Sequence, residues 1–167
     1  MLRPAAVYGE RDRLLAVRLA ALVRSPLVPM LGPGRNTLPV VYAGNVAAAV
    51  ERCLDREPED SPRTYDLGVD EPLTQEGLLA GMARALGARP RFVRIPAALV
   101  RGCVQLVERL RLTVPGAGDL SLSRFARLAL DENPYVTRRI RSELGWTPAF
   151  GHEEALARTA AWLTLGA

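Results

Sequence analysis

The sequence has 167 residues, of which 49% are hydrophobic and 24% are charged. These proportions are typical of a globular protein with its own core, and they exclude intrinsically disordered and collagen-like chains. The formal net charge is +4, and every basic residue except His152 is an arginine. Because the sequence contains no lysine, Schiff-base enzymes and P-loop nucleotide-binding proteins are excluded.

The charge and cysteine patterns indicate a cytoplasmic protein that binds neither nucleic acid nor membranes. The arginines are spread from Arg3 to Arg158 without interleaved aromatic residues, which argues against a nucleic-acid interface. Cys53 and Cys103 lie in apolar helical patterns without a CxxC partner, so we expect buried, reduced thiols. We also expect neither a secretion signal nor a membrane span, since no apolar run reaches about 18 residues.

Strands and helices alternate along the first third of the chain. The patterns predict, in order, a strand over 1–9, a helix over 12–24, a short extended run over 27–31, a strand over 39–43 and a helix over 45–54. Asn45 is predicted to be the N-cap of that last helix. Residues 57–62 form a polar loop bounded by proline.

The alternation continues beyond this loop. A strand is predicted over 64–69, followed by a helix that Thr74 caps and Gly87 ends. Next come a strand over 92–95, a long amphipathic helix over 96–112, a Gly/Pro-rich turn over 115–118 and further helices, of which the last covers 153–165. This order indicates an α/β fold, and we expect residues 1–167 to form one domain.

Four groups of motifs follow one another in a recognisable order. They are LRPAAVYG at 2–9; GPGRN at 32–36 with VVYAGNVA at 40–47; YDLG at 65–68 with LT at 73–74; and LGWTP at 144–148 with EEAL at 153–156 and Trp162. Together they resemble the C-terminal half of an extended short-chain dehydrogenase/reductase, of the NAD-dependent epimerase/dehydratase family. The resemblance implies a truncated Rossmann-like fold, with a few parallel strands and a helical substrate-binding subdomain. It also implies that Trp146 packs a terminal turn against the domain and that Trp162 anchors the final helix.

The parts of that family that handle the cofactor are not in this sequence. The family holds NAD(P) on a Gly-rich turn after its first strand, and its acid/base tyrosine works with a lysine four residues on. Without a lysine, a tyrosine with a pKa of about 10 is a poor base at neutral pH. We therefore expect no autonomous hydride transfer and no tight NAD(P) binding by this chain alone, and NAD(P) binding once an N-terminal half completes it.

By resemblance, six residues lie near the substrate or the cofactor: Arg3, Pro4, Val7, Tyr8, Arg35 and Asn45. The residues themselves also permit structural interpretations. Residues 3–7 read as a buried sheet strand, Arg35 as a solvated arginine on a turn, and Asn45 as the N-cap. The stretch before the VVY strand reads Thr37-Leu38-Pro39, where relatives that bind sugar nucleotides carry an arginine, and this argues against a nucleotide-sugar substrate.

Two further features have simple structural explanations. His152 precedes two glutamates at the start of the last helix, but a lone histidine forms no metal ligand set, so we expect no metal site. Gly77 and Gly81 lie within a helical pattern, where close packing between helices explains them better than phosphate binding does.

The sequence is consistent with two functions from different classes. In the first, the chain is the substrate-binding half of an NAD(P)-dependent epimerase, dehydratase or reductase, and it joins an N-terminal half. In the second, it is a stand-alone module that binds a small molecule, or acts as an accessory protein or non-redox enzyme, with a homodimer covering its bare sheet edge. A Gly-rich turn and a Tyr-x-x-x-Lys motif encoded just upstream would distinguish the first from the second.

Overall fold

A computed structural model describes residues 1–55, 63–68, 71–109, 130–131 and 137–165. Its elements are β1 (Leu2–Pro4), β2 (Ala6–Tyr8), α1 (Leu15–Val23), β3 (Leu27–Leu31), β4 (Val40–Tyr42), α2 (Ala43–Leu54), β5 (Tyr65–Leu67), α3 (Gln75–Ala85), β6 (Arg91–Ile95), α4 (Ala97–Arg109), α6 (Arg138–Leu144) and α7 (His152–Leu165). The predicted alternation of strands and helices is confirmed. The predicted loop at 57–62, the turn at 115–118 and the predicted end of the long helix at Leu112 lie outside the described residues.

The predicted N-terminal strand is divided because its partner changes. β1 pairs in parallel with β5, whereas β2 pairs in parallel with β4. The change falls between two neighbouring amides: Ala5 donates to the carbonyl of Leu67 at 2.9 Å, and Ala6 donates to that of Pro39 at 3.1 Å. β3 and β6 form a third parallel pair.

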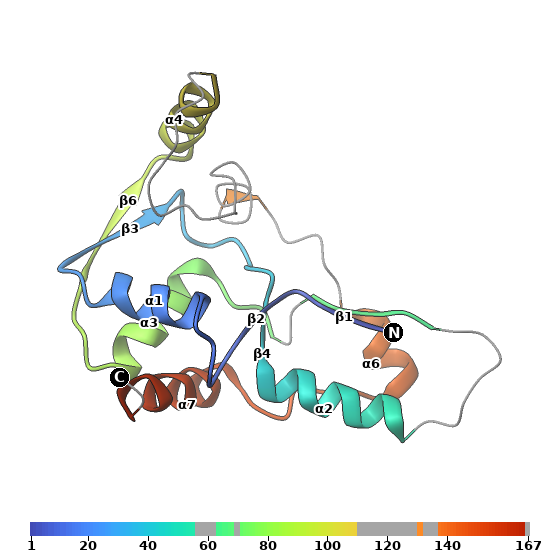
Figure 1. The fold of residues 1–167 in the computed structure, drawn as a ribbon. Helices are drawn as coiled ribbons and strands as arrows, with labels where there is room; N and C mark the ends of the chain where they lie inside the picture. The colour runs from blue at the N-terminus through green and yellow to red at the C-terminus, as the bar shows by residue number, and fades with distance from the viewer. Residues whose placement is uncertain (56–62, 69–70, 110–129, 132–136, 166–167) are drawn as a thin grey trace.

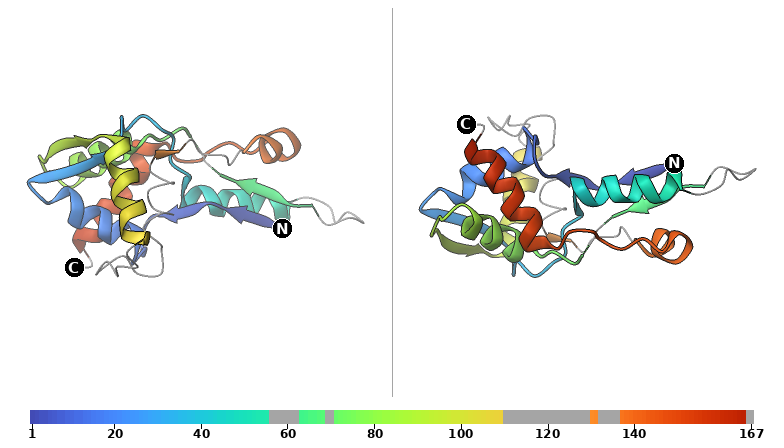
Figure 2. Two further views of the ribbon diagram at one scale, coloured as in Figure 1. Left: turned by 90° about the horizontal axis from the view of Figure 1, so that it is seen from above. Right: turned by 90° about the horizontal axis from the view of Figure 1, so that it is seen from below.

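The elements gather in two groups, which Figures 1 and 2 show on either side of β2 and β4. We call the group of β1, β5, α2 and α6 the α2 lobe. The group of α1, α3, α7, β3, β6 and α4 is the α7 lobe. The N-terminus lies in the first lobe and the C-terminus in the second, at opposite ends of the molecule (Figure 1).

Close helix contacts build the core of the α7 lobe. Thr74 caps α3 as predicted, because its hydroxyl accepts the Gly77 amide at 3.0 Å, and Gly87 follows the helix in a left-handed conformation with φ +66°. A Cβ at Gly81 would lie 2.5 Å from Leu156 Cδ1 on α7. Glycine therefore permits the close approach of α3 to α7, which confirms the packing interpretation of this residue.

Trp146 fills the core of the α2 lobe. Its side chain is 1% exposed and belongs to a cluster with Val41, Leu67 and Ile140. The predicted packing of the terminal turn against the domain is thus confirmed. Trp162 is partly buried beside Leu163 and α1, in a smaller cluster of the α7 lobe.

Strand β4 contributes to both cores. Its three residues are all buried, and successive side chains of a strand point to opposite faces. Val40 and Tyr42 accordingly belong to the core of the α7 lobe, whereas Val41 belongs to that of the α2 lobe.

Helix α4 lies largely outside both cores. Leu99 is 59% exposed and Leu106 is 57% exposed, while Val104 is buried. The predicted burial of the thiols is wrong for Cys103, which is exposed, whereas Cys53 on α2 is half-buried against the core of the α2 lobe. Cys103 is exposed because α4 follows β6 directly and projects from the end of the α7 lobe, away from both cores (Figure 1). Among the described residues, no helix is long and apolar enough to cross a bilayer.

Candidate functional site

The strand formed by β1 and β2 has an open side, by which we mean the edge of each half that pairs with no other strand among the described residues. Arg3, Pro4, Ala6 and Val7 are exposed, with Val7 at 39%. The buried-strand interpretation of residues 3–7 is therefore wrong. Each half of this strand has one partner strand within the described part of the chain, whereas a parallel strand is normally flanked and covered on both faces.

Arg3 is oriented by its neighbour across the pair of strands. It stands in register with Asp66 on β5, and two charge-assisted hydrogen bonds join them: Nε to Oδ1 at 2.8 Å and Nη2 to Oδ2 at 3.2 Å. Both side chains are well exposed, so the ion pair contributes little to stability. Its effect is to fix the guanidinium beside the open side of β1.

Tyr8 faces the interior, on the opposite side of β2 from Val7. Its side chain is 1% exposed, and its ring centroid lies 5.8 Å from that of Tyr42. Gly9 follows in a tight position, since a Cβ there would lie 2.9 Å from the Cβ of Ala43. Glycine therefore permits the close approach between the carboxyl end of β2 and the start of α2.

Tyr42 is a hydrogen-bond donor at this point. Its hydroxyl lies 2.8 Å from each carboxylate oxygen of Glu10. Burial raises the pKa of Tyr42 to about 12, with a further contribution from the hydrogen bond to Glu10. A phenol with so high a pKa stays protonated at neutral pH and does not act as a general base.

Asn45 joins α2 to the segment that precedes α7. Its side chain is completely buried; Nδ2 donates to the Phe150 carbonyl and Oδ1 accepts the Phe150 amide, both at 2.9 Å. The predicted N-cap role is wrong because α2 already begins at Ala43, with Tyr42 as its extended N-cap residue. The Phe150 ring meets Tyr42 edge-on, with centroids 5.5 Å apart.

The six predicted residues thus fall into three places. Tyr8 and Asn45 are linked through the rings of Tyr42 and Phe150, inside the molecule. Arg3, Pro4 and Val7 lie along the open side of the strand. Arg35 is exposed on the turn after β3, which confirms its interpretation as a solvated turn residue.

Sequence reasoning did not find Glu10 or Phe150. Asn45 and Phe150 are 105 positions apart, so no local pattern connects them. Glu10 follows the VYG motif with no feature that would indicate its bond to Tyr42.

His152 shows no sign of a metal site. It is the first residue of α7, its side chain is 19% exposed, and Nε2 lies 3.7 Å from Glu71 Oε2. In the part of the chain that the structure describes, no group of three or more His, Cys, Asp or Glu side chains is placed to hold a metal ion.

Sequence comparisons find relatives among known dehydrogenases and reductases. Residues 1–57 match the model of the 3-beta hydroxysteroid dehydrogenase/isomerase family. The chain is 29% identical over 166 residues to a 2-alkyl-3-oxoalkanoate reductase of Stenotrophomonas maltophilia, which covers 94% of this chain and 49% of that protein. Across the curated relatives that it matches, the chain spans between 30% and 49% of their length.

Solved structures show the same fold. A human epimerase family protein, crystallised with NADPH, has a TM-score of 0.66 at 19% identity, over 96% of this chain and 47% of that one. UDP-glucose 4-epimerase of Thermotoga maritima, solved with UDP-glucose, has a TM-score of 0.61 at 19% identity, over 99% of this chain and 45% of that one. The predicted Rossmann-like α/β fold class is confirmed.

Proposed function

We propose that this chain, which is related to the extended short-chain dehydrogenases/reductases as its sequence predicts, is the substrate-side half of an NAD(P)-dependent reductase, dehydratase or epimerase. Residues 1–167 form this half as one domain. A Gly-rich nucleotide-binding half, on the same polypeptide or on another, supplies the cofactor site and the Tyr-x-x-x-Lys pair. The small-molecule substrate lies between the two halves.

The open side of β1 and β2 is the observation that carries this proposal. Parallel strands of Rossmann-like sheets are normally flanked by further strands and covered by helices. Here Ala6 and Val7 are exposed at the middle of the strand, and Val50 and Leu54 on α2 are 43% and 77% exposed. A second half that continues the sheet would cover such a surface.

The residues of this chain then have limited roles. Arg3, Pro4 and Val7 are exposed on the strand that the second half would cover, so they are the ones placed to meet cofactor or substrate. Tyr42 packs against Tyr8 at the carboxyl end of β2, and Asn45 ties α2 to Phe150. We assign the acid/base step to the other half, because this sequence offers no lysine to lower the pKa of a tyrosine, and Tyr42 keeps its proton at neutral pH.

The relatives' names favour a substrate class. A 3-oxoalkanoate and a 3-hydroxysteroid both carry a reducible oxo or oxidisable hydroxyl group on an apolar body. We assign the substrate of this chain to that class rather than to the nucleotide sugars, in line with the Thr37-Leu38-Pro39 stretch.

The test compares the chain alone with the chain joined to its second half. The coding sequence on either side is read for a Gly-rich turn and a Tyr-x-x-x-Lys motif, and both forms are titrated with NADH and NADPH by cofactor fluorescence. We expect saturable binding only when that half is present. Saturable binding at low micromolar concentration by the chain alone would overturn the proposal, as would a second half that neither associates nor binds cofactor.

A further inference from the structure

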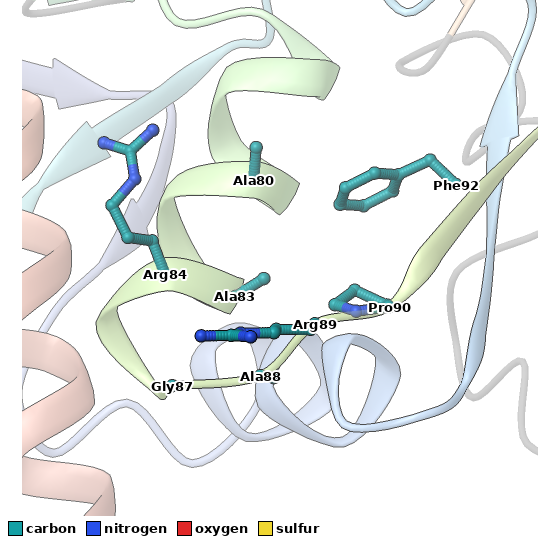
Figure 3. Close-up of a pocket in the computed structure, with 8 residues that line it drawn as sticks. All are labelled: Ala80, Ala83, Arg84, Gly87, Ala88, Arg89, Pro90 and Phe92. Carbon is teal, nitrogen blue, oxygen red and sulfur yellow. The ribbon is translucent and has the colours of Figure 1, made fainter.

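A pocket lies at the C-terminal end of α3, away from the open side of β1 and β2. Its volume is about 390 Å³, within the range of small-molecule sites. It lies between the last turns of α3 and the start of β6, and it is lined by Ala80, Ala83, Arg84, Gly87, Ala88, Arg89, Pro90 and Phe92 (Figure 3).

Small residues on one side and rings on the other shape an apolar slot. Ala80 and Ala83 are three residues apart and therefore share one face of α3. Figure 3 shows the Phe92 ring and the Pro90 ring on the side opposite these alanines. A flat aromatic ring fits such a slot. One face of the ring would lie on the half-buried Ala80 and on the edge of the buried Ala83, and its other face or its edge would contact Phe92.

The rim of the slot carries an available positive charge. Arg84 already pairs with Glu153 on α7 at 3.1 Å. Arg89 is exposed beside the slot (Figure 3). Within the described residues its guanidinium has no hydrogen bond or ion pair. A guanidinium binds carboxylates through paired N–H donors, so Arg89 complements a ligand with one carboxylate.

We propose that this pocket binds a small aromatic carboxylate, with its ring between α3 and Phe92 and its carboxylate on Arg89. The site is formed by α3 and β6 and includes none of the residues placed along β1 and β2. It therefore stands independently of the function proposed above.

The test uses 2-naphthoate and its neutral analogue 2-naphthalenemethanol with the full chain. Binding is followed by amide shifts in ¹H–¹⁵N NMR spectra. We expect 2-naphthoate to saturate, with the largest shifts at Gly87, Ala88 and Phe92. The neutral analogue should bind at least about tenfold more weakly, because it lacks the charge-assisted hydrogen bond. The proposal is overturned if 2-naphthoate does not saturate at millimolar concentration or if both compounds bind equally.

Three variants separate the slot from the charge. Ala80→Leu fills the slot and should abolish binding, whereas Arg89→Gln should weaken 2-naphthoate about tenfold and leave the neutral analogue unchanged. Arg91→Gln is the matched control, since Arg91 is exposed nearby on β6 and does not line the pocket. Arg89→Gln alters an exposed side chain and keeps the fold, so parent-like binding by this variant would refute the proposal even if Ala80→Leu misfolds.

Discussion

Replacement of Asn45 by alanine should destabilise the domain strongly. The side chain is completely buried and makes two 2.9 Å hydrogen bonds to the backbone of Phe150. Its removal leaves the amide and the carbonyl of the half-buried Phe150 without their partner, at about 1–3 kcal/mol for each group. We therefore expect a loss of about 2–6 kcal/mol, a large share of the 5–15 kcal/mol typical of a domain.

Urea unfolding of the parent and two variants measures this loss. Thr164→Ala is the control, because it also deletes a side-chain hydrogen bond, to the Ala161 carbonyl at 2.8 Å, but at an exposed position. It should change the free energy of unfolding by less than about 0.5 kcal/mol. If Asn45→Ala unfolds at the same urea concentration as the control, the two bonds to Phe150 do not hold α2 and the terminal segment together.

Three other predictions concern acid stability, the tryptophans and self-association. Hydrogen bonds from Arg139 and Arg63 lower the pKa of Glu143 from 4.5 to about 2, so its contribution to stability is present above pH 4.5 and is lost as the pH falls toward 2. In urea melts, Glu143→Gln should lose that part of the acid dependence, and a parent-like acid profile would contradict the network. Trp146→Ala should cost about 3–5 kcal/mol, more than Trp162→Ala at its partly buried site, while Arg35→Ala should stay within about 0.5 kcal/mol; equal melts for all three would refute the packing described above. The exposed apolar surface should make the isolated chain self-associate, and sedimentation as a monomer at every concentration would count against this expectation.

Local patterns predict the elements of this fold well. Thr74 and Gly87 mark the ends of α3, and both act as predicted because capping depends on the residue and its immediate neighbours. The strands before and after α1 and α3 are likewise predicted correctly, because the apolar pattern of a strand is also local. The packing interpretation of Gly81 is correct too, since a glycine inside a helix indicates a close neighbour.

Features that depend on distant partners could not be predicted. The division of the strand at Ala5 follows from a change of partner between β5 and β4. Asn45 looks like an N-cap in sequence because its partner, Phe150, is 105 residues away. The exposure of α4 likewise depends on where the end of β6 directs it, and its apolar pattern carries no information on that point.

Strand β4 has a consequence for how the molecule unfolds. Its three residues divide between the two cores, so the lobes share a very short stretch of backbone at this point. Packed interiors transmit a change of volume to their neighbours instead of absorbing it. A substitution that alters the size of Val41 should therefore disturb Val40 and Tyr42 as well, and through them the core of the α7 lobe. The two lobes should accordingly unfold in one cooperative transition rather than in two separate ones.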